Sequence, residues 1–140
     1  MKSKSNLLYW LFIALILIFF LYQKGYIFAN FENITPIEAF KQLRKERNIT
    51  IVDVRTKEEI RHEGKIPGSI LIPISILEQN LDRLKNYKNN KLFIYCRTGN
   101  RSIQASRILS NHGFKAYNLK GGINDWKRDN LPISLPKFIN

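Results

Sequence analysis

Sixteen consecutive uncharged and mostly apolar residues, positions 7 to 22, constrain this chain more than any other feature. As a helix, the run would span about 24 Å, which is short of the roughly 30 Å hydrocarbon core of a bilayer. Continuing the helix to Phe28, with the Lys24 amine extended to the interface, gives about 33 Å and closes that gap. We therefore expect residues 1–29 to form an uncleaved single-pass membrane anchor that contacts lipid through residues 7–28.

A cleavable signal peptide has the same charged start and apolar run. Its cleavage site needs small residues, and Ala29 is small but Ile27, two positions earlier, is not. The sequence therefore favours an anchor over a cleaved signal, and both over a buried core helix. Lys2 and Lys4 precede the run and Lys24 follows it, a balance that leans towards a domain outside the cell.

Positive charge dominates the chain, whose formal net charge is +12. After residue 30 there are 20 basic and 11 acidic residues, a net charge of +9. Such a domain suits a position beside anionic lipid headgroups, although diffuse basicity without a specific partner is the simpler interpretation. No basic stripe with interleaved aromatic residues indicates nucleic-acid binding. The single cysteine excludes an internal disulfide, and His62 and His112 fall in polar stretches typical of a surface, so we expect no metal and no cofactor.

Helix and strand patterns alternate through residues 30–140, which we expect to form one domain. Thr35, Pro36 and Glu38 match an N-cap, a first helical position and a capping-box partner, which predicts a helix over about 36–47. The other expected elements are strands at 50–54, 69–72, 91–95 and 115–119 and helices from 56, 75–84, 102–112 and within 121–130. This alternation predicts an α/β fold with a mostly parallel sheet and helices on both faces.

The only cysteine, Cys96, lies at the carboxyl end of the strand expected at 91–95, where ligands bind in open parallel sheets. A helix follows after a polar and basic loop that contains one glycine, namely Arg97, Thr98, Gly99, Asn100 and Arg101. Such a loop can direct several backbone N–H groups at one anion, reinforced by the helix dipole.

A thiol in this loop, beside two arginines, should have a lowered pKa, and the thiolate is its nucleophilic form. Lone cysteines at strand ends are more often inert packing residues. Inert packing, however, does not require a glycine-containing loop flanked by arginines. We therefore interpret Cys96 as an activated nucleophile.

Three separated motifs resemble the rhodanese family over residues 31–135. "IVDVRTKEE" with "GKIPGSILIP" is similar to the family's Asp-Val-Arg and Gly-His-Ile-Pro-Gly-Ala stretches, "CRTGNRS" to its active-site loop, and "LKGGINDWKRDNLPI" to its Gly-Gly, Trp and Leu-Pro ending. The resemblance implies a rhodanese-like parallel sheet of about five strands. Lys65 stands where the family often has histidine, outside the loop, and Asn130 replaces a frequent glycine, a mild change because Asn tolerates the left-handed conformation.

The resemblance implies a sulfurtransferase in which Cys96 accepts sulfane sulfur as a persulfide and passes it to a thiol or to cyanide. The backbone from Arg97 to Ser102 would cradle the sulfur, and Arg97 and Arg101 would attract a small anionic donor such as thiosulfate or a persulfide. Asp53 and Arg55 would support the base of the loop, with an ion pair that only braces the fold as an equal alternative.

Other functions stay open beside this one. In rhodanese-fold phosphatases the arginine is the sixth residue after the cysteine, whereas here Ser102 holds that position and Arg101 comes one residue earlier. The shorter loop matches one sulfur better than a tetrahedral phosphate, which disfavours a phosphatase. A persulfide carrier that serves one partner, or a non-enzymatic binding module, would have the same sequence features, and the oligomeric state stays unknown.

Overall fold

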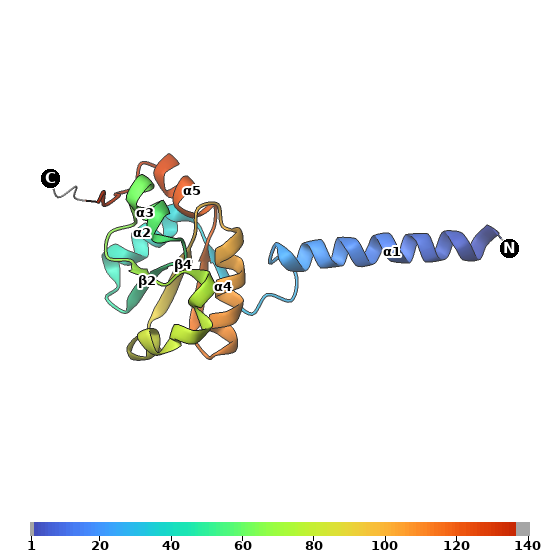
Figure 1. Cartoon of the computed structure of the whole chain (residues 1–140), viewed down its shortest axis with the longest axis horizontal. Coiled ribbons are helices and arrows are strands. Elements are labelled where there is room, and N and C mark those ends of the chain that lie inside the picture. The colour runs from blue at the N-terminus through green and yellow to red at the C-terminus, as the bar shows by residue number, and fades with distance from the viewer. Residues whose placement is uncertain (1, 137–140) are drawn as a thin grey trace.

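Helix α1 (Lys2–Gln23) projects from the rest of the chain as a separate rod (Figure 1). This computed structural model describes residues 2–136, so the expected anchor start at residue 1 and domain end at residue 140 lie outside the described residues. The 22 residues of α1 span about 33 Å. Its segment Asn6–Gln23 is long and apolar enough to cross a membrane, and none of it is buried.

The predicted continuation of this helix to Phe28 is wrong. The helix ends at Gln23, Gly25 follows with a φ of 74°, and Phe28 itself has a φ of 51°, which is incompatible with a right-handed helix. The helix still has the expected span of about 33 Å, because it begins at Lys2, before the apolar run.

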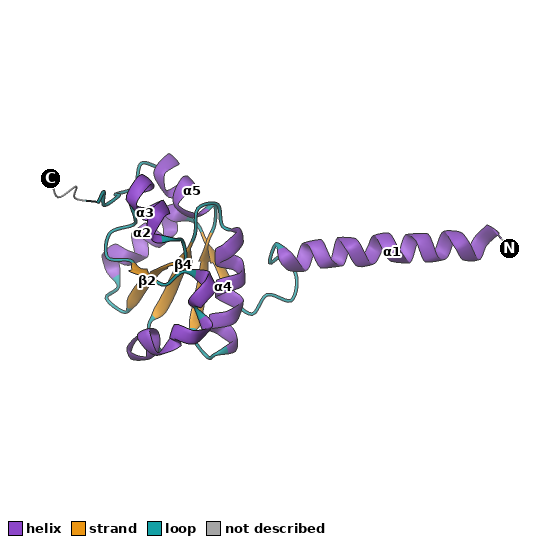
Figure 2. Ribbon diagram, in the orientation of Figure 1, coloured by secondary structure: helices purple, strands orange, loops and turns teal. Residues whose placement is uncertain are grey.

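Within the described residues, five strands form one parallel sheet in the order β1-β5-β4-β2-β3 (Figure 2). The strands are β1 (Glu32–Ile34), β2 (Ile49–Asp53), β3 (Ile70–Leu71), β4 (Lys91–Tyr95) and β5 (Lys115–Leu119). The sequence did not predict β1, because a three-residue segment is too short to show strand periodicity. Its pairing with β5 places the segment that follows α1 at the sheet edge.

Up to residue 136, four α-helices follow α1: α2 (Pro36–Lys45), α3 (Lys57–Glu63), α4 (Asn100–Asn111) and α5 (Gly122–Arg128). The predicted caps form, since the Thr35 hydroxyl accepts a hydrogen bond from the Glu38 N–H, and Thr56 and Glu59 make a reciprocal capping box. These interactions are local in sequence, which explains why the helix starts could be predicted.

The helix predicted over 75–84 is wrong in type. Two 3₁₀ segments, η1 (Ile74–Ile76) and η2 (Glu78–Tyr87), take its place, and Asn80 has non-helical angles. The Asn80 side chain donates to the Ile76 carbonyl over 2.8 Å, so its own N–H bonds to Leu77 instead. A short amide side chain has thus taken the acceptor that an α-helix would use at this position.

The strand alternation of β4 divides the core between the two faces of the sheet. Leu92, Ile94 and Cys96 belong to the cluster packed under α4, the 3₁₀ segments and the Phe31 side chain. Phe93 and Tyr95 belong to the opposite cluster, under α2 and α5. Both faces are therefore covered, as predicted, and Cys96 lies on the α4 face at the end of a buried strand.

Candidate active site

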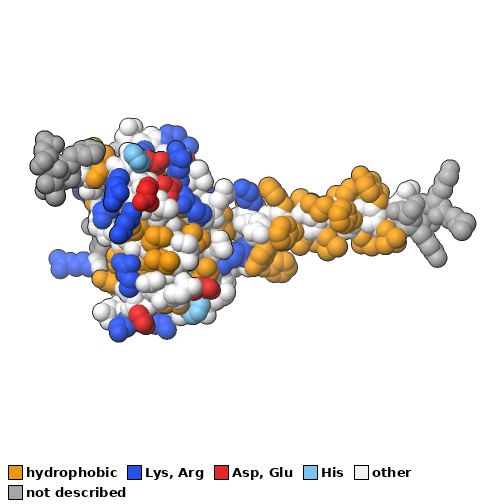
Figure 3. Space-filling model, in the orientation of Figure 1, with side chains coloured by type: hydrophobic (Ala, Val, Ile, Leu, Met, Phe, Trp, Pro, Cys, Tyr) orange, Lys and Arg blue, Asp and Glu red, His pale blue; other side chains and the backbone are white. Residues whose placement is uncertain are grey.

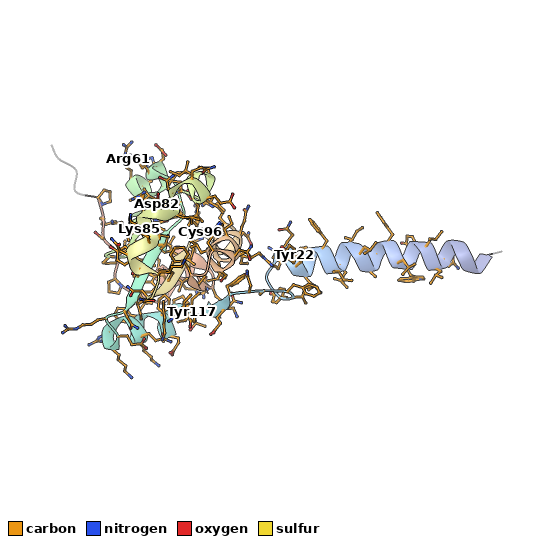
Figure 4. The ribbon with its side chains drawn as sticks, turned by 90° about the horizontal axis from the view of Figure 1, so that it is seen from below. Tyr22, Arg61, Asp82, Lys85, Cys96 and Tyr117 are labelled. Carbon is orange, nitrogen blue, oxygen red and sulfur yellow. The ribbon has the colours of Figure 1, made fainter. Side chains whose placement is uncertain are left out.

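The Cys96 thiol lies at the floor of the loop between β4 and α4, inside the body of the domain (Figure 4). Its residue is 1% exposed. The Gly99 N–H donates to Sγ over 3.1 Å, and Ser102 Oγ lies 3.5 Å from the same sulfur. Gly99 has a φ of 103°, which allows the loop to curl over the thiol because glycine has no Cβ.

Helix α5 holds the loop from the side away from the sulfur. The N–H groups of Ile123 and Asn124 donate to the carbonyls of Cys96 and Arg97 over 2.9 and 3.1 Å. Because the carbonyl and N–H of a trans peptide point in opposite directions, these bonds turn the following N–H groups towards the sulfur. The loop conformation is therefore fixed by contacts that lie about 25 residues away in the sequence.

Gly122 makes the close approach of α5 possible. A Cβ at this position would lie 2.4 Å from the Cys96 carbonyl oxygen and 2.6 Å from that of Arg97. Sequence reasoning used "GG" only as part of a family motif and missed its role as the support of the loop.

Opposing effects act on the pKa of Cys96. Burial raises the pKa, whereas the hydrogen bond with the Ser102 hydroxyl and those from the backbone N–H groups of Ser102, Gly99 and Thr98 lower it, and the net direction is downward. The lowered pKa expected from the sequence is present, with hydrogen bonds as the leading stabilising contacts rather than the two arginines. The lowered pKa increases the fraction of Cys96 that is the nucleophilic thiolate.

Both loop arginines are paired with carboxylates of α3. Arg101 donates two hydrogen bonds to Glu59, over 2.6 and 2.9 Å, and Arg97 lies 3.2 Å from Glu63. Arg101 holds the pKa of Glu59 down to about 2. The sequence singled out the arginines but not these partners. Their spacing of four residues, which places both carboxylates on one helix face, is the signal that could have identified them.

Asp53 and Arg55 form a buried ion pair behind the loop. Both side chains are fully buried, and the Arg55 guanidinium donates to Asp53 over 2.8 to 3.2 Å and to the Gly64 carbonyl over 2.7 Å. Tyr95 donates its hydroxyl to Asp53 over 2.6 Å. The pair therefore fastens the ends of β2 and β4 to the end of α3, the geometry expected of a bracing role.

One carboxylate connects this pair to the loop. Glu63 lies 3.5 Å from Arg55 and 3.2 Å from Arg97. The support of the loop by Asp53 and Arg55 is thus indirect and passes through Glu63, a residue that sequence reasoning did not select.

Behind the thiol, a chain of polar side chains leads to the sheet edge. Ser102 Oγ lies 2.7 Å from Asn118 Oδ1, and the Asn118 amide donates to Asn33 Oδ1 over 2.8 Å. Asn118, on β5, is 3% exposed. Sequence reasoning missed both asparagines because they lie on the strand pair β1–β5, one member of which was not predicted.

The two histidines are exposed, as expected. In the part of the chain that the structure describes, no three His, Cys, Asp or Glu side chains come together as metal ligands.

A family model for the rhodanese-like domain matches residues 36–129. The chain belongs to the rhodanese-like family. The matched range contains the cysteine loop, its α3 partners and α5, while α1 and β1 precede it.

Rhodanese-like proteins from other organisms are similar over most of this domain. A sulfurtransferase of Allochromatium vinosum is 35% identical over 98 residues, which cover 69% of this chain and 89% of that protein. A putative sulfur carrier protein of Bacillus subtilis is 36% identical over 92 residues, and this chain spans 48% of its length. The crystal structure of a rhodanese-related protein from Thermoplasma volcanium superposes with a TM-score of 0.69 at 30% identity, covering 76% of this chain and all of that one.

Proposed function

We propose that this protein is a sulfurtransferase in which Cys96 carries sulfane sulfur as a persulfide. The observation that carries the proposal is the hydrogen bond from Gly99 N–H to Cys96 Sγ, made by a loop whose carbonyls are held away by α5. Such converging N–H groups stabilise a thiolate and a persulfide anion equally well. The similarity to proteins named as a sulfurtransferase and a putative sulfur carrier supports the same chemistry.

In the first half of the proposed reaction, the Cys96 thiolate attacks the outer sulfur of thiosulfate. A bond forms between Sγ and that sulfur, and the bond between the two sulfurs of thiosulfate breaks, so that sulfite leaves with its electron pair. The product on the protein is the anion Cys96–S–S⁻. The N–H groups of the loop from Arg97 to Ser102 would hold this anion, and those of Thr98, Gly99 and Ser102 already contact the sulfur.

In the second half, the thiolate of an acceptor attacks the outer sulfur of the protonated persulfide. The acceptor becomes a persulfide, and Cys96 leaves as the thiolate, so the site is ready for another donor. Cyanide can take the same sulfur and become thiocyanate. We assign Arg97, whose side chain is 57% exposed, to the attraction of the anionic donor, and Arg101 to holding the loop on Glu59 as well.

The test uses the full chain in micelles of an uncharged detergent. We expect thiosulfate to add one sulfur atom to Cys96, which intact-mass measurement would detect. With cyanide also present, we expect the protein to produce thiocyanate over repeated cycles. Cys96→Ser should lose both, while Ser110→Ala, on the far part of α4, should keep both. Phosphatase turnover without sulfur transfer, or sulfur transfer by Cys96→Ser, would contradict the proposal. A persulfide that forms but passes to no small acceptor would identify a carrier.

We also propose that residues 1–29 anchor the domain of residues 30–140 to a membrane through α1. Large apolar side chains of α1 are between one third and two thirds exposed, and Figure 3 shows them along the visible face of this helix. A rod of this kind is costly to expose to water and favourable in lipid. The membrane side can be tested in intact cells with Lys127→Cys, an exposed position on α5. Labelling by an impermeant maleimide without lysis, above the level of the parent chain, is expected for a domain outside the cell.

A further inference from the structure

A recess of about 350 Å³ adjoins the cysteine loop on the side of β1 and β5. Thr98 and Gly99 of the loop form one wall, Lys120 and Asn118 of the β5 end form another, and Lys24 and Tyr26 form a third. We infer that this recess binds the carboxylate-bearing part of a small thiol substrate and that Lys24, from the segment after α1, is a specificity-determining residue. The inference rests on the proposed sulfur transfer.

The segment after α1 is fastened to α4. Lys24 Nζ donates to Asn100 Oδ1 over 3.1 Å, and Gly25 is buried against Phe31 and Ile103. Arg107 stacks on the Tyr22 ring at 3.9 Å and donates to the Tyr22 carbonyl. Figure 4 shows Tyr22 where α1 meets the domain. The chain therefore brings a lysine from outside the matched family range, residues 36–129, to the edge of the loop and holds it there.

The charges around the recess favour an anionic ligand. Lys24 and Lys120 line it, and neither forms an ion pair with any residue that the structure describes. The described lining includes no acidic side chain. The two loop arginines, in contrast, are already paired with Glu59 and Glu63. The lysines thus provide the positive charge available to a substrate carboxylate on this side of the loop.

Two residues that line the recess also take part in the contacts around the Cys96 sulfur. Gly99 lines it and also donates its N–H to Cys96 Sγ. Asn118 lines it and also contacts Ser102, the side chain 3.5 Å from that sulfur. We therefore expect a ligand whose anionic end contacts Lys24 and Lys120 to lie with its other end beside Thr98 and Gly99 of the loop. The volume is at the lower end of small-molecule sites, about 300 to 1,000 Å³, which suits an organic thiol better than thiosulfate alone.

The test compares two acceptors, glutathione and its diethyl ester, in which both carboxylates are esterified and uncharged, with thiosulfate as the donor. The full chain is assayed in micelles of an uncharged detergent, so that no lipid anion competes. For Lys24→Gln and for Lys120→Gln we expect the KM for glutathione to rise about tenfold or more, the loss of one charge-assisted hydrogen bond. The KM for the diethyl ester should not change, and Lys24→Arg should largely restore the value for glutathione. Lys41→Gln, an exposed lysine of α2 outside the recess, is the matched control.

Persulfide formation on Cys96 from thiosulfate, followed by intact mass, should be the same in all these variants. That result would show that the variants are folded. Equal KM changes for glutathione and its ester, or none for either, would overturn the inference. If the wild-type chain forms no persulfide, the proposed function fails separately. Binding of unreactive S-methylglutathione then still tests the recess: weaker binding by Lys24→Gln supports it, and equal binding, or none by the wild type, refutes it.

Discussion

Arg101 and Glu59 form an ion pair with two hydrogen bonds, of 2.6 and 2.9 Å, which joins the first turn of α4 to the first turn of α3. The same carboxylate accepts the Thr56 N–H and so completes the capping box of α3. One glutamate therefore orders a helix start and holds an arginine of the cysteine loop. Its loss has consequences both for stability and for the loop.

Glu59→Gln keeps a capping-box acceptor but removes the charge, and we expect a loss of about 1 kcal/mol in the free energy of unfolding at neutral pH. Because the folded pKa of Glu59 is lowered from 4.5 to about 2, its stabilisation is complete above pH 4.5 and is lost as the pH falls towards 2. Thermal unfolding of the full chain in micelles, measured between pH 4.5 and about 2, should show this loss of stability in the wild type. Glu58→Gln, which changes an exposed neighbour, should show the same loss. Equal pH profiles for Glu59→Gln and the wild type would contradict it.

Ser102→Ala should raise the pKa of Cys96. The hydroxyl is the first of the hydrogen-bonding groups that lower this pKa against the effect of burial, and a thiolate that loses a donor is protonated more easily. The rate of alkylation by iodoacetamide, measured against pH, reports this pKa, and the midpoint of its pH profile should lie higher in the variant than in the wild type. Ser110→Ala, which changes a serine of α4 away from the thiol, should leave the midpoint of the alkylation profile unchanged. An unchanged midpoint in Ser102→Ala would show that the backbone N–H groups suffice.

Gly122→Ala should disrupt the loop, whereas Gly68→Ala should not. Both glycines have positive φ, 58° and 77°, so alanine costs about 1–2 kcal/mol at either position. Only at Gly122 would the new Cβ clash with backbone, 2.4 Å from the Cys96 carbonyl oxygen. A Cβ added at Gly68 would have no atom within 4 Å. Gly122→Ala is therefore expected to lose about 1–3 kcal/mol more than Gly68→Ala in denaturant unfolding, and to lose persulfide formation. Equal losses of stability in the two variants would rule out the close approach.

Asp53→Asn should destabilise the domain by about 3–5 kcal/mol, because it removes the fully buried carboxylate that pairs with Arg55 and leaves only Glu63, at 3.5 Å, as a charged partner. Arg128→Gln, which breaks the exposed pair with Asp125, should cost about 0–1 kcal/mol. Denaturant unfolding followed by circular dichroism gives both values. If Asp53→Asn keeps its stability but loses sulfur transfer, then the pair acts on the substrate and is not a brace.

The parts of this structure that the sequence predicted are those set by neighbouring residues. Thr35 and Thr56 cap helices through bonds to residues three positions away, and the buried run 91–95 leads directly into Cys96 and the loop. The error at 75–84 is also local, because Asn80 supports either a helix or a competing turn and its rotamer decides between them. The error at Phe28 comes from the turn at Gly25, whose packing against Phe31 and Ile103 has no local pattern.

Taken alone, the sequence determined the α/β alternation, the apolar helix and the position of the thiol at the end of a buried strand, since each depends on periodicity, caps or composition within a short window. The tertiary structure decided what surrounds that thiol. Glu59 meets Arg101 across 42 positions and Lys24 meets Asn100 across 76, because the strand order brings α3, α5 and the segment after α1 around one loop. Contacts over such separations depend on the packing of the whole sheet, which is why no local pattern could predict them.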